Sequence, residues 1–471
     1  MFGLDAGLTS LLIICLIIAC LFEFVNGFHD TANAVATVIY THSLKPQFAV
    51  IWSGFWNFVG VNLGGIAVAM GIVNLLPMEV LMDQNVYHSI SLILSLIVTA
   101  VAWNLGTWYF GIPCSSSHTL LGSIFGVGLA CMILPGSQSV ALNWGKVGDV
   151  MLSLLVSPLF GFGLAALIMF LLRNMVKNNL IFKEPPTKKA PPFWIRTILI
   201  LSCTSVSFSH GSNDGQKGVG LVMIILIGIA PAFFAVDTSK DPSILGKNVA
   251  QIELFLNKID TNKISIQEKS DLKTVFKHTN DLETIIAGNV SFINLKDNKQ
   301  FAIRKDILTL SKKVETNIKN KQSYYYKSLA VSDVKSLESV IKETKSFTEY
   351  SPTWVIIMIS LSLGFGTMIG WKRIVVTIGE KIGKSHLTYS QGFSAELVAA
   401  STIGASSWLG LPVSTTHVLS SGIAGSMVAG GGLKNLQPKT VKSILIAWLI
   451  TLPVTILLSG TMFLILRMIF V

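Results

Sequence analysis

Two short polar stretches, each with an aspartate, interrupt apolar segments of the chain. NGFHDTANA covers residues 26–34 and contains Asp30, and HGSNDGQKG covers residues 210–218 and contains Asp214. An ionised carboxylate at bilayer depth costs on the order of 3 kcal/mol or more unless it faces a cavity, a partner charge or an ion. With nearby amide and backbone carbonyl oxygens, each aspartate could form a cation site. The alternative is that each one caps a broken helix or pairs with a lysine.

The residues around the two aspartates complete the predicted cation site. Gly27 and Gly211 precede them, and we expect the helix to break locally at both glycines and to offer carbonyl oxygens. An imidazole titrates near neutral pH, so a histidine directly before the first aspartate could couple cation binding to protons. The predicted cation-binding or coupling residues are Asp30, Asp214, Asn33, Asn213 and His29.

Two further stretches are rich in hydroxyl groups. GIPCSSSH covers residues 111–118 and GLPVSTTH covers residues 410–417, and each places a proline shortly before three Ser or Thr residues. The free N–H groups and positive dipole end of a helix that starts there would, with the hydroxyls, suit a phosphate-like oxyanion. The alternative is that the hydroxyls only satisfy backbone or cross-helix hydrogen bonds. The predicted anion-binding residues are Ser115, Ser116, Ser117, Ser414, Thr415 and Thr416.

Five other polar residues are accessory candidates. Two glutamates lie inside apolar segments, where each could extend the polar site or make a structural hydrogen bond. Two histidines end the hydroxyl stretches and are expected to orient them or cap a helix, with a proton relay as the alternative. A lysine three residues after the second aspartate could neutralise that aspartate or attract an anion. These residues are Glu23, Glu396, His118, His417 and Lys217.

The four stretches form an internal repeat. Asp30 and His118 are 88 residues apart, Asp214 and His417 are 203 apart, and the difference of 115 nearly equals the 114 residues of the polar segment 237–350. Each half contains five apolar segments, an odd number, so the second half must lie inverted in the membrane. Discontinuous helices that meet near the midplane of such a repeat are typical of secondary transporters.

The elements that must position these residues are predicted to be membrane helices. The chain has 471 residues, of which 51% are hydrophobic and 13% charged, which indicates a polytopic membrane protein. The first apolar segment begins near Leu8 without a basic region or cleavage site and is interpreted as a retained helix. With the N-terminus outside, 14 of the 17 Lys and Arg residues outside segment 237–350 fall on the cytoplasmic side, as the positive-inside rule expects. The ten predicted apolar segments cover about 8–41, 48–73, 89–110, 112–133, 148–173, 194–235, 352–371, 391–408, 411–430 and 443–466.

The fold class predicted is an all-α polytopic membrane protein, an inverted-repeat secondary transporter with discontinuous helices or re-entrant hairpins plus an inserted module. The module holds 19 of the 36 Lys and Arg residues and 15 of the 25 Asp and Glu residues, so the net charge of +11 does not indicate a nucleic-acid partner. The five cysteines lie in apolar segments and indicate neither a disulfide framework nor a metal centre. The predicted parts are a first transmembrane repeat (1–173), a basic cytoplasmic linker (174–193), the start of the second repeat (194–236), an inserted, mostly helical extracytoplasmic module (237–350) and the rest of the second repeat (351–471).

Enzymatic functions fit the sequence poorly. GSNDGQKG lacks both the second glycine and the final hydroxyl residue of the ATP-binding loop G-x-x-x-x-G-K-[ST]. An intramembrane serine hydrolase built from the serines, His118 and Asp30 would lack the G-x-S-x-G elbow. We therefore expect no enzymatic activity and no resident cofactor.

Longer stretches around these motifs resemble the inorganic phosphate transporter (PiT) family, in particular the bacterial low-affinity phosphate permeases of the inner membrane. They are GFHDTANAVATVIYTHSL, NLGTWYFGIPCSSSHTLLG, FSHGSNDGQKGVGLV and GLPVSTTHVLSSGIAG. The resemblance implies cation-coupled symport of inorganic phosphate across the plasma membrane, the inner membrane in a Gram-negative cell, and leaves a homodimer open. It places phosphate and its coupling ions among the residues named above. The alternatives are another oxyanion such as sulfate, or, from a different class, an anion channel or a phosphate sensor.

The sequence departs from the family pattern at both aspartates. His29 stands where the family pattern G-A-N-D-V-A-N-A has asparagine, and the second stretch reads GQKG where VANA is usual. His29 favours protons over sodium as the coupling ion. The resemblance also raises a neutral divalent metal–phosphate complex as the transported species. The role of Lys217 stays open between neutralising Asp214 and attracting phosphate.

Overall fold

The computed structural model describes residues 2–76, 86–134, 142–186, 189–288, 291–295 and 297–470, and over these ranges the chain is helical apart from turns, loops and one isolated bridge. It divides into two compact units. The smaller unit consists of Met1–Ala6 and Leu226–Tyr350, and the larger unit of Gly7–Ile225 and Ser351–Val471. The predicted all-α class is confirmed over the described residues.

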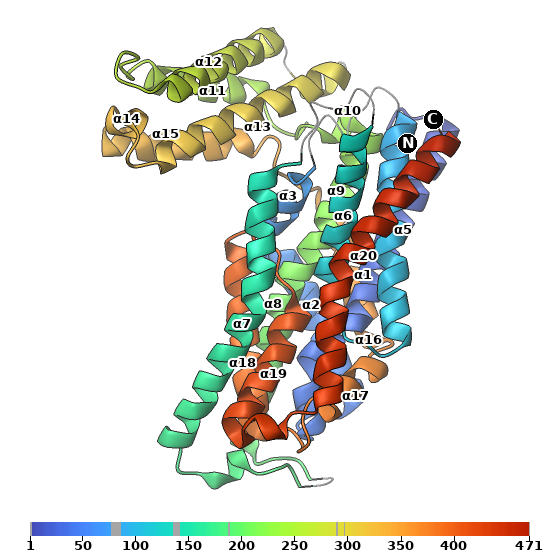
Figure 1. Ribbon diagram of the computed structural model, residues 1–471. Helices are drawn as coiled ribbons and strands as arrows, with labels where there is room; N and C mark the ends of the chain where they lie inside the picture. The colour runs from blue at the N-terminus through green and yellow to red at the C-terminus, as the bar shows by residue number, and fades with distance from the viewer. Residues whose placement is uncertain are drawn as a thin grey trace. The chain divides into compact units, whose positions relative to one another are not determined.

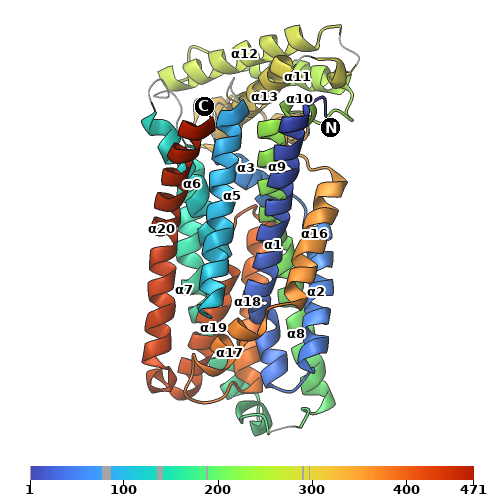
Figure 2. The same ribbon diagram turned by 90° about the vertical axis from the view of Figure 1, so that its right-hand side faces the viewer.

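Five helices of the larger unit are long and apolar enough to cross a membrane by themselves. Helices α2 (Pro46–Leu63) and α3 (Ala67–Val73) together could form a sixth span, bent by 71° at a short break. In both ribbon views α20 runs beside α5 and α6 (Figures 1 and 2). The five long helices are α1 (Ala6–Tyr40), α5 (Val86–Tyr109), α6 (Ser116–Ile133), α7 (Trp144–Met175) and α20 (Pro438–Phe470).

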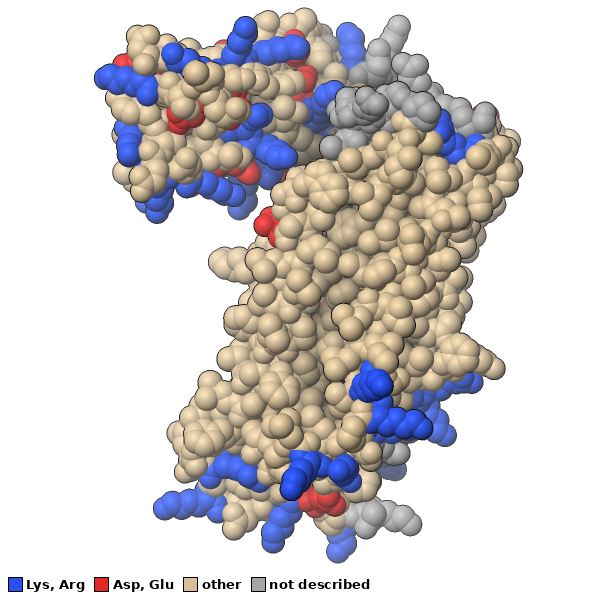
Figure 3. Space-filling model, viewed as in Figure 1, with Lys and Arg blue, Asp and Glu red and all other residues tan. Residues whose placement is uncertain are grey.

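Each predicted apolar segment coincides with one of these helices or with shorter helices, and segment 194–235 runs beyond Ile225 into the smaller unit. A predicted cytoplasmic loop forms the short helix α17 (Lys372–Glu380). On the face drawn in Figure 3, most of the visible Lys and Arg residues of the larger unit lie at the end that carries the loop between α7 and α8, next to a wide surface without charged side chains. The remaining helices are α8 (Phe193–His210), α9 (Gln216–Ile229), α16 (Thr353–Met368), α18 (Tyr389–Trp408) and α19 (Thr415–Gly431).

The predicted helix break at Gly27 is wrong. Helix α1 continues through this residue to Tyr40. A Cβ atom at Gly27 would lie 2.5 Å from the carbonyl oxygen of Leu363 and 2.7 Å from the backbone nitrogen of Thr367. The glycine therefore lets α1 and α16 approach backbone to backbone, as small residues do between membrane helices.

Gly211 also differs from the prediction. Helices α8 and α9 are joined by a π-helical turn, Gly211–Gly215, so the helix is widened here and not broken. A Cβ atom on Gly211 would collide with the backbone of Asn57 on α2. Such π turns are often found at functional sites, because they redirect side chains without ending the helix.

The two hydroxyl stretches begin with the same backbone turn. Gly111 and Gly410 have positive φ angles of 65° and 69°, a conformation in which glycine avoids a Cβ clash. At the first turn the N–H of Ile112 bonds the carbonyl of Thr107 at 3.0 Å, and at the second the N–H of Leu411 bonds the carbonyl of Ser406 at 2.9 Å. Both turns thus end α5 and α18 with the Schellman pattern, and each reverses the chain toward α6 or α19.

The smaller unit has its own apolar core, formed by helices and short turns. The buried guanidinium of Arg304 bonds the carbonyl oxygens of Ala235, at 3.0 Å, and Thr348, at 2.7 Å. This side chain thereby ties the beginning of the unit to its end. Its helices are α10 (Pro231–Phe234), α11 (Pro242–Leu256), α12 (Ile266–Ile286), α13 (Asp297–Lys319), α14 (Tyr324–Lys327) and α15 (Val331–Lys345).

Candidate functional site

The two predicted aspartates come together inside the larger unit. Asp30 lies on α1 and Asp214 in the π turn, and both are fully buried. The Ser116 hydroxyl at the start of α6 is 3.0 Å from an oxygen of Asp30 and 3.4 Å from an oxygen of Asp214. One hydroxyl group therefore contacts the carboxylates of both halves of the chain.

The second hydroxyl stretch reaches the same carboxylates. The Thr416 hydroxyl donates to Asp30 at 2.5 Å, and the Thr415 hydroxyl lies 3.5 Å from Asp214. Helices α6 and α19 thus both direct their N-terminal ends toward the aspartate pair. Such ends carry free N–H groups and partial positive charge, which favours anions.

Ser115 and Ser414 serve as the N-caps of α6 and α19. Each hydroxyl oxygen accepts the backbone N–H of the histidine three residues later, at 3.1 Å in both helices. This is the usual role of serine before a helix. Of the predicted anion ligands, these two are engaged by the backbone, whereas the hydroxyls of Ser116, Thr415 and Thr416 face the carboxylates.

Lys217 connects the second aspartate to the first hydroxyl stretch. Its ammonium nitrogen is 2.7 Å from Asp214, 2.5 Å from the Ser117 hydroxyl and 2.9 Å from the carbonyl oxygen of Val413. The side chain is 1% exposed. The lysine therefore neutralises Asp214 in this structure, which was one of the two roles considered from the sequence.

The other predicted cation residues have different positions. The ring Nδ1 of His29 lies 3.6 Å from Asp30, and its Nε2 lies 3.4 Å from the Thr107 hydroxyl on α5. Asn213 instead holds the loop before α19: its amide nitrogen is 3.2 Å from the Leu411 carbonyl, and its oxygen accepts the Val413 N–H at 3.3 Å. The side chain of Asn33 lies outside the described residues.

The four accessory residues other than Lys217 surround this cluster without joining it directly. Glu23 accepts a hydrogen bond from Asn26 and packs against Gly218, where a Cβ would lie 2.5 Å from a carboxylate oxygen. Glu396 on α18 accepts a hydrogen bond from Ser202 on α8. The His118 and His417 rings lie 4.5 Å apart, and His417 stacks on Trp448. These positions are compatible with structural roles.

His210 is a site residue that sequence reasoning missed. Its Nε2 atom lies 3.5 Å from Asp214 and 3.9 Å from Asp30, and the ring is buried. The available signal was its spacing, because residues four apart lie on one face of a helix. The three side chains bring ligand atoms within 4.8 Å of one another, and they combine two carboxylates with an imidazole.

A hydrogen-bond chain orients the His210 ring. The Thr367 hydroxyl donates to the Leu363 carbonyl at 2.8 Å, so its oxygen accepts the Asn57 amide N–H at 3.1 Å. The amide oxygen of Asn57 is then the acceptor for His210 Nδ1 at 2.8 Å. In the neutral ring this leaves the lone pair on Nε2, which faces the two carboxylates.

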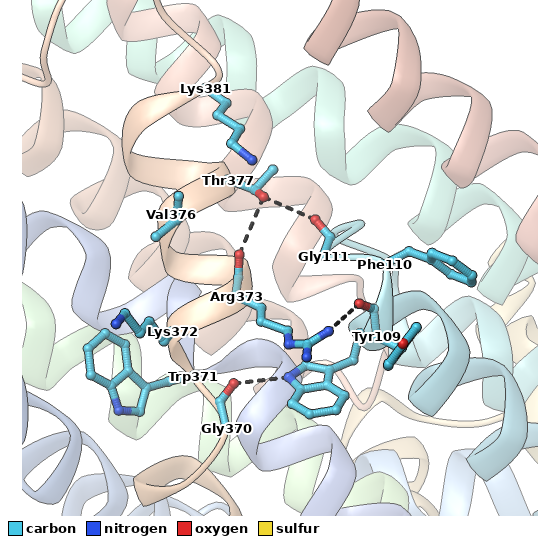
Figure 4. Close-up of a pocket in the computed structure, with 11 residues that line it drawn as sticks. Tyr109, Phe110, Gly111, Gly370, Trp371, Lys372, Arg373, Val376, Thr377 and Lys381 are labelled. Atoms are coloured by element: carbon cyan, nitrogen blue, oxygen red, sulfur yellow. Dashed lines mark hydrogen bonds between the residues drawn. The ribbon is translucent and has the colours of Figure 1, made fainter.

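A cavity of about 730 Å³ lies elsewhere in the larger unit, between the end of α5 and α17 (Figure 4). The Arg373 guanidinium lies 4.9 Å from the centre of the Trp108 ring and donates to the Tyr109 carbonyl at 2.5 Å. None of the described side chains predicted to bind cation or phosphate lines it. The cavity is therefore distinct from the aspartate cluster.

A family model described as the phosphate transporter family matches residues 26–459. The chain belongs to the phosphate transporter family. It is 41% identical to the low-affinity inorganic phosphate transporters PitB and PitA of Escherichia coli, over 98% of this chain and 97% of each relative. A probable low-affinity inorganic phosphate transporter of Bacillus subtilis is 29% identical over 98% of both chains.

The family membership confirms the predicted resemblance and sets the chain among transporters and not enzymes. The predicted multi-pass membrane location agrees with the family and with the five long apolar helices. The fold is similar to a solved structure described as the sodium-dependent phosphate transporter, with a TM-score of 0.54 and 20% identity over 98% of this chain and 100% of that one.

Proposed function

We propose that this chain is a symporter that carries inorganic phosphate together with a cation across the plasma membrane. The observation that carries the proposal is the meeting of Asp30 and Asp214, from different halves of the chain, at hydroxyl groups that begin α6 and α19. The carboxylates would bind the cation, and the hydroxyls and helix N-termini would bind phosphate. A buried site with both kinds of ligand suits a carrier that must bind two ions of opposite charge.

The hydrogen bonds between these groups suggest how the two ions are coupled. With the carboxylates ionised, Ser116 and Thr416 donate their hydroxyl protons to Asp30. A cation or proton on Asp30 would neutralise this acceptor and release the hydroxyls. They could then donate to a phosphate oxygen, for which charge-assisted hydrogen bonds are strong. Cation binding would thus raise phosphate affinity, and linkage requires the converse as well.

The proton is the proposed coupling ion. His29 lies 3.6 Å from Asp30, close enough to exchange a proton with it through a small shift or one water molecule. A sodium-coupled carrier remains the alternative.

We further propose that the two halves are inverted repeats, that 237–350 is an extracytoplasmic module and that the carrier can form a homodimer.

A divalent metal–phosphate complex is a second candidate for the transported species. The cluster of Asp30, His210 and Asp214 favours it, because two carboxylates and an imidazole lone pair form a donor set for a divalent cation. The metal would then be cargo that enters and leaves with phosphate. Phosphate in this complex could still accept hydrogen bonds from the helix N-termini.

Uptake of labelled phosphate into proteoliposomes, with proton and sodium gradients imposed separately and with or without Mg²⁺, tests the proposal. We expect accumulation above equilibrium with an inward proton gradient, stimulated by Mg²⁺, and loss of accumulation in Asp30→Asn. Asp149→Asn, an exposed carboxylate on α7, is the matched control. Accumulation by Asp30→Asn at the native rate would refute the coupling role, and competition by sulfate as strong as by arsenate would refute phosphate selectivity.

A further inference from the structure

The ammonium group of Lys217 lies in a position suited to a metal cation. Its three contacts within 3 Å are all oxygen atoms: a carboxylate of Asp214, the hydroxyl of Ser117 and the backbone carbonyl of Val413. Carboxylate, hydroxyl and exposed carbonyl oxygens are the ligands by which transporters hold small hard cations beside irregular backbone. Lys217 and Asp214 are both at most 1% exposed.

Comparison of the two halves shows that Lys217 takes the place of a direct bond between a carboxylate and a hydroxyl group. When the motifs are aligned, Asp214 corresponds to Asp30 and Ser117 corresponds to Thr416. In one pair the Thr416 hydroxyl bonds Asp30 directly at 2.5 Å. In the other pair the Lys217 ammonium bonds both the carboxylate, at 2.7 Å, and the hydroxyl, at 2.5 Å. A lysine ammonium is therefore inserted between the carboxylate and the hydroxyl of one pair, whereas the members of the other pair bond each other directly.

We propose that Lys217 is a tethered cation, which permanently occupies one of two related cation positions and lowers by one the number of mobile cations carried with each phosphate. This inference rests on the proposed symport function. With Asp214 neutralised by the lysine, the mobile cation or proton would bind at Asp30. A buried ion pair of this kind is costly to split, because removal of one partner leaves the other charge uncompensated.

The test replaces the lysine by asparagine, the residue at the aligned position 33. Lys217→Asn would leave the oxygens around Asp214 without their cation, and we expect sodium to occupy them. The purified carrier should then melt about 2–4 °C higher in saturating NaCl than in the same concentration of choline chloride. The native carrier and Lys189→Asn, which removes an exposed lysine, should show no such difference.

Transport gives a second and independent readout. In proteoliposomes, the reversal potential should show one more positive charge moved per phosphate for Lys217→Asn than for the native carrier. The inference is overturned if folded Lys217→Asn shows no sodium-dependent stabilisation, or if the native carrier shows an equal one. The melting experiment needs no transport, so it separates failure of this inference from failure of the proposed symport.

The double variant Asp214→Asn/Lys217→Asn keeps the test decisive if the single variant does not fold. It buries no charge at either position, so it should be more stable than Lys217→Asn and insensitive to sodium. Lys217→Arg, which keeps a positive charge, should also be insensitive to sodium. A double variant that is less stable than both single variants would contradict a charge-compensating lysine.

Discussion

The hydroxyl of Thr416, near the end of the chain, donates a hydrogen bond of 2.5 Å to Asp30, near its beginning. The two residues are 386 positions apart, and each belongs to a polar stretch recognised by its repetition. The aspartate of one half is therefore bonded by the hydroxyl stretch of the other, so neither half of the chain contains the whole polar cluster.

Replacement of Thr416 by valine should weaken phosphate binding. Valine keeps the shape and removes the donor, and a hydrogen bond to a charged group contributes about 1.5–3 kcal/mol. We expect the KM for phosphate to rise about tenfold or more, while Thr416→Ser, which retains the hydroxyl, stays near the native value. Uptake kinetics in proteoliposomes measure this. An unchanged KM in the valine variant would show that this hydroxyl does not contact phosphate.

Asn57 should control the metal dependence of uptake through His210. Asn57→Leu removes the hydrogen-bond partner of His210 Nδ1, which orients the ring with Nε2 toward the two carboxylates. Loss of such an outer partner typically weakens metal binding 10–100-fold. The Mg²⁺ concentration for half-maximal uptake should rise by about that factor. Asn62→Leu, an exposed residue of the same helix, is the control, and equal Mg²⁺ dependence in the two variants would argue against a metal at His210.

Gly27→Ala should destabilise the larger unit. The new Cβ would meet the backbone of α16, which cannot rotate away as a side chain could, and overpacking typically costs about 1–3 kcal/mol. We expect a lower melting temperature in detergent. Gly106→Ala on α5 has no atom within 4 Å of the added Cβ and should be neutral or slightly stabilising. Equal melting temperatures for Gly27→Ala and Gly106→Ala would mean that α1 and α16 can move apart at little cost.

Asp271 should make the smaller unit sensitive to acid. Burial disfavours its charged form, but hydrogen bonds from Lys313, at 2.6 Å, and Asn317, at 3.2 Å, outweigh burial and lower the pKa of Asp271. A carboxylate whose pKa is lowered by folding stabilises the folded state above its ordinary pKa of about 4. This stabilisation is lost as the pH falls through the lowered value.

Hydrogen–deuterium exchange of α12 and α13 measures this effect. At pH 6 the amides of Asp271→Asn should exchange faster than those of the native chain, and at pH 3 the difference should shrink. Glu338→Gln, an exposed carboxylate on α15, should match the native chain at both pH values. A difference that is as large at pH 3 as at pH 6 would exclude ionisation of Asp271 as its cause.

The internal repeat made it possible to predict which residues meet at the polar cluster. It did not predict the helix geometry around them. Asp30, Asp214, Ser116 and Thr416 come together in the structure, and the recurrence of the same polar patterns at the same corrected spacing is what made this meeting predictable. The glycines were misread, because a sequence does not distinguish a glycine that breaks a helix from one that admits a neighbouring backbone.

Two other features depended on partners distant in sequence. His210 is directed at the carboxylates by Asn57 on another helix, and Asn213 turns to the loop before α19. Neither orientation can be inferred from residue type alone. The sequence predicts that Ser115 and Ser414 bind an anion with their neighbours. In the structure both are N-caps, and their hydroxyl oxygens accept backbone N–H groups.

The π turn at Gly211–Gly215 also changes the helical phase. A π turn takes in one residue more than an α turn, and each residue corresponds to about 100° around the helix axis. The side chains of α9 are therefore rotated by about that angle from where an uninterrupted helix would direct them. Helix α1 is α-helical from Ala6 to Tyr40 and has no such change of phase. Two polar stretches that share a glycine and an aspartate at matching positions thus diverge in direction immediately after the aspartates, and the backbone as well as the lysine makes their surroundings unequal.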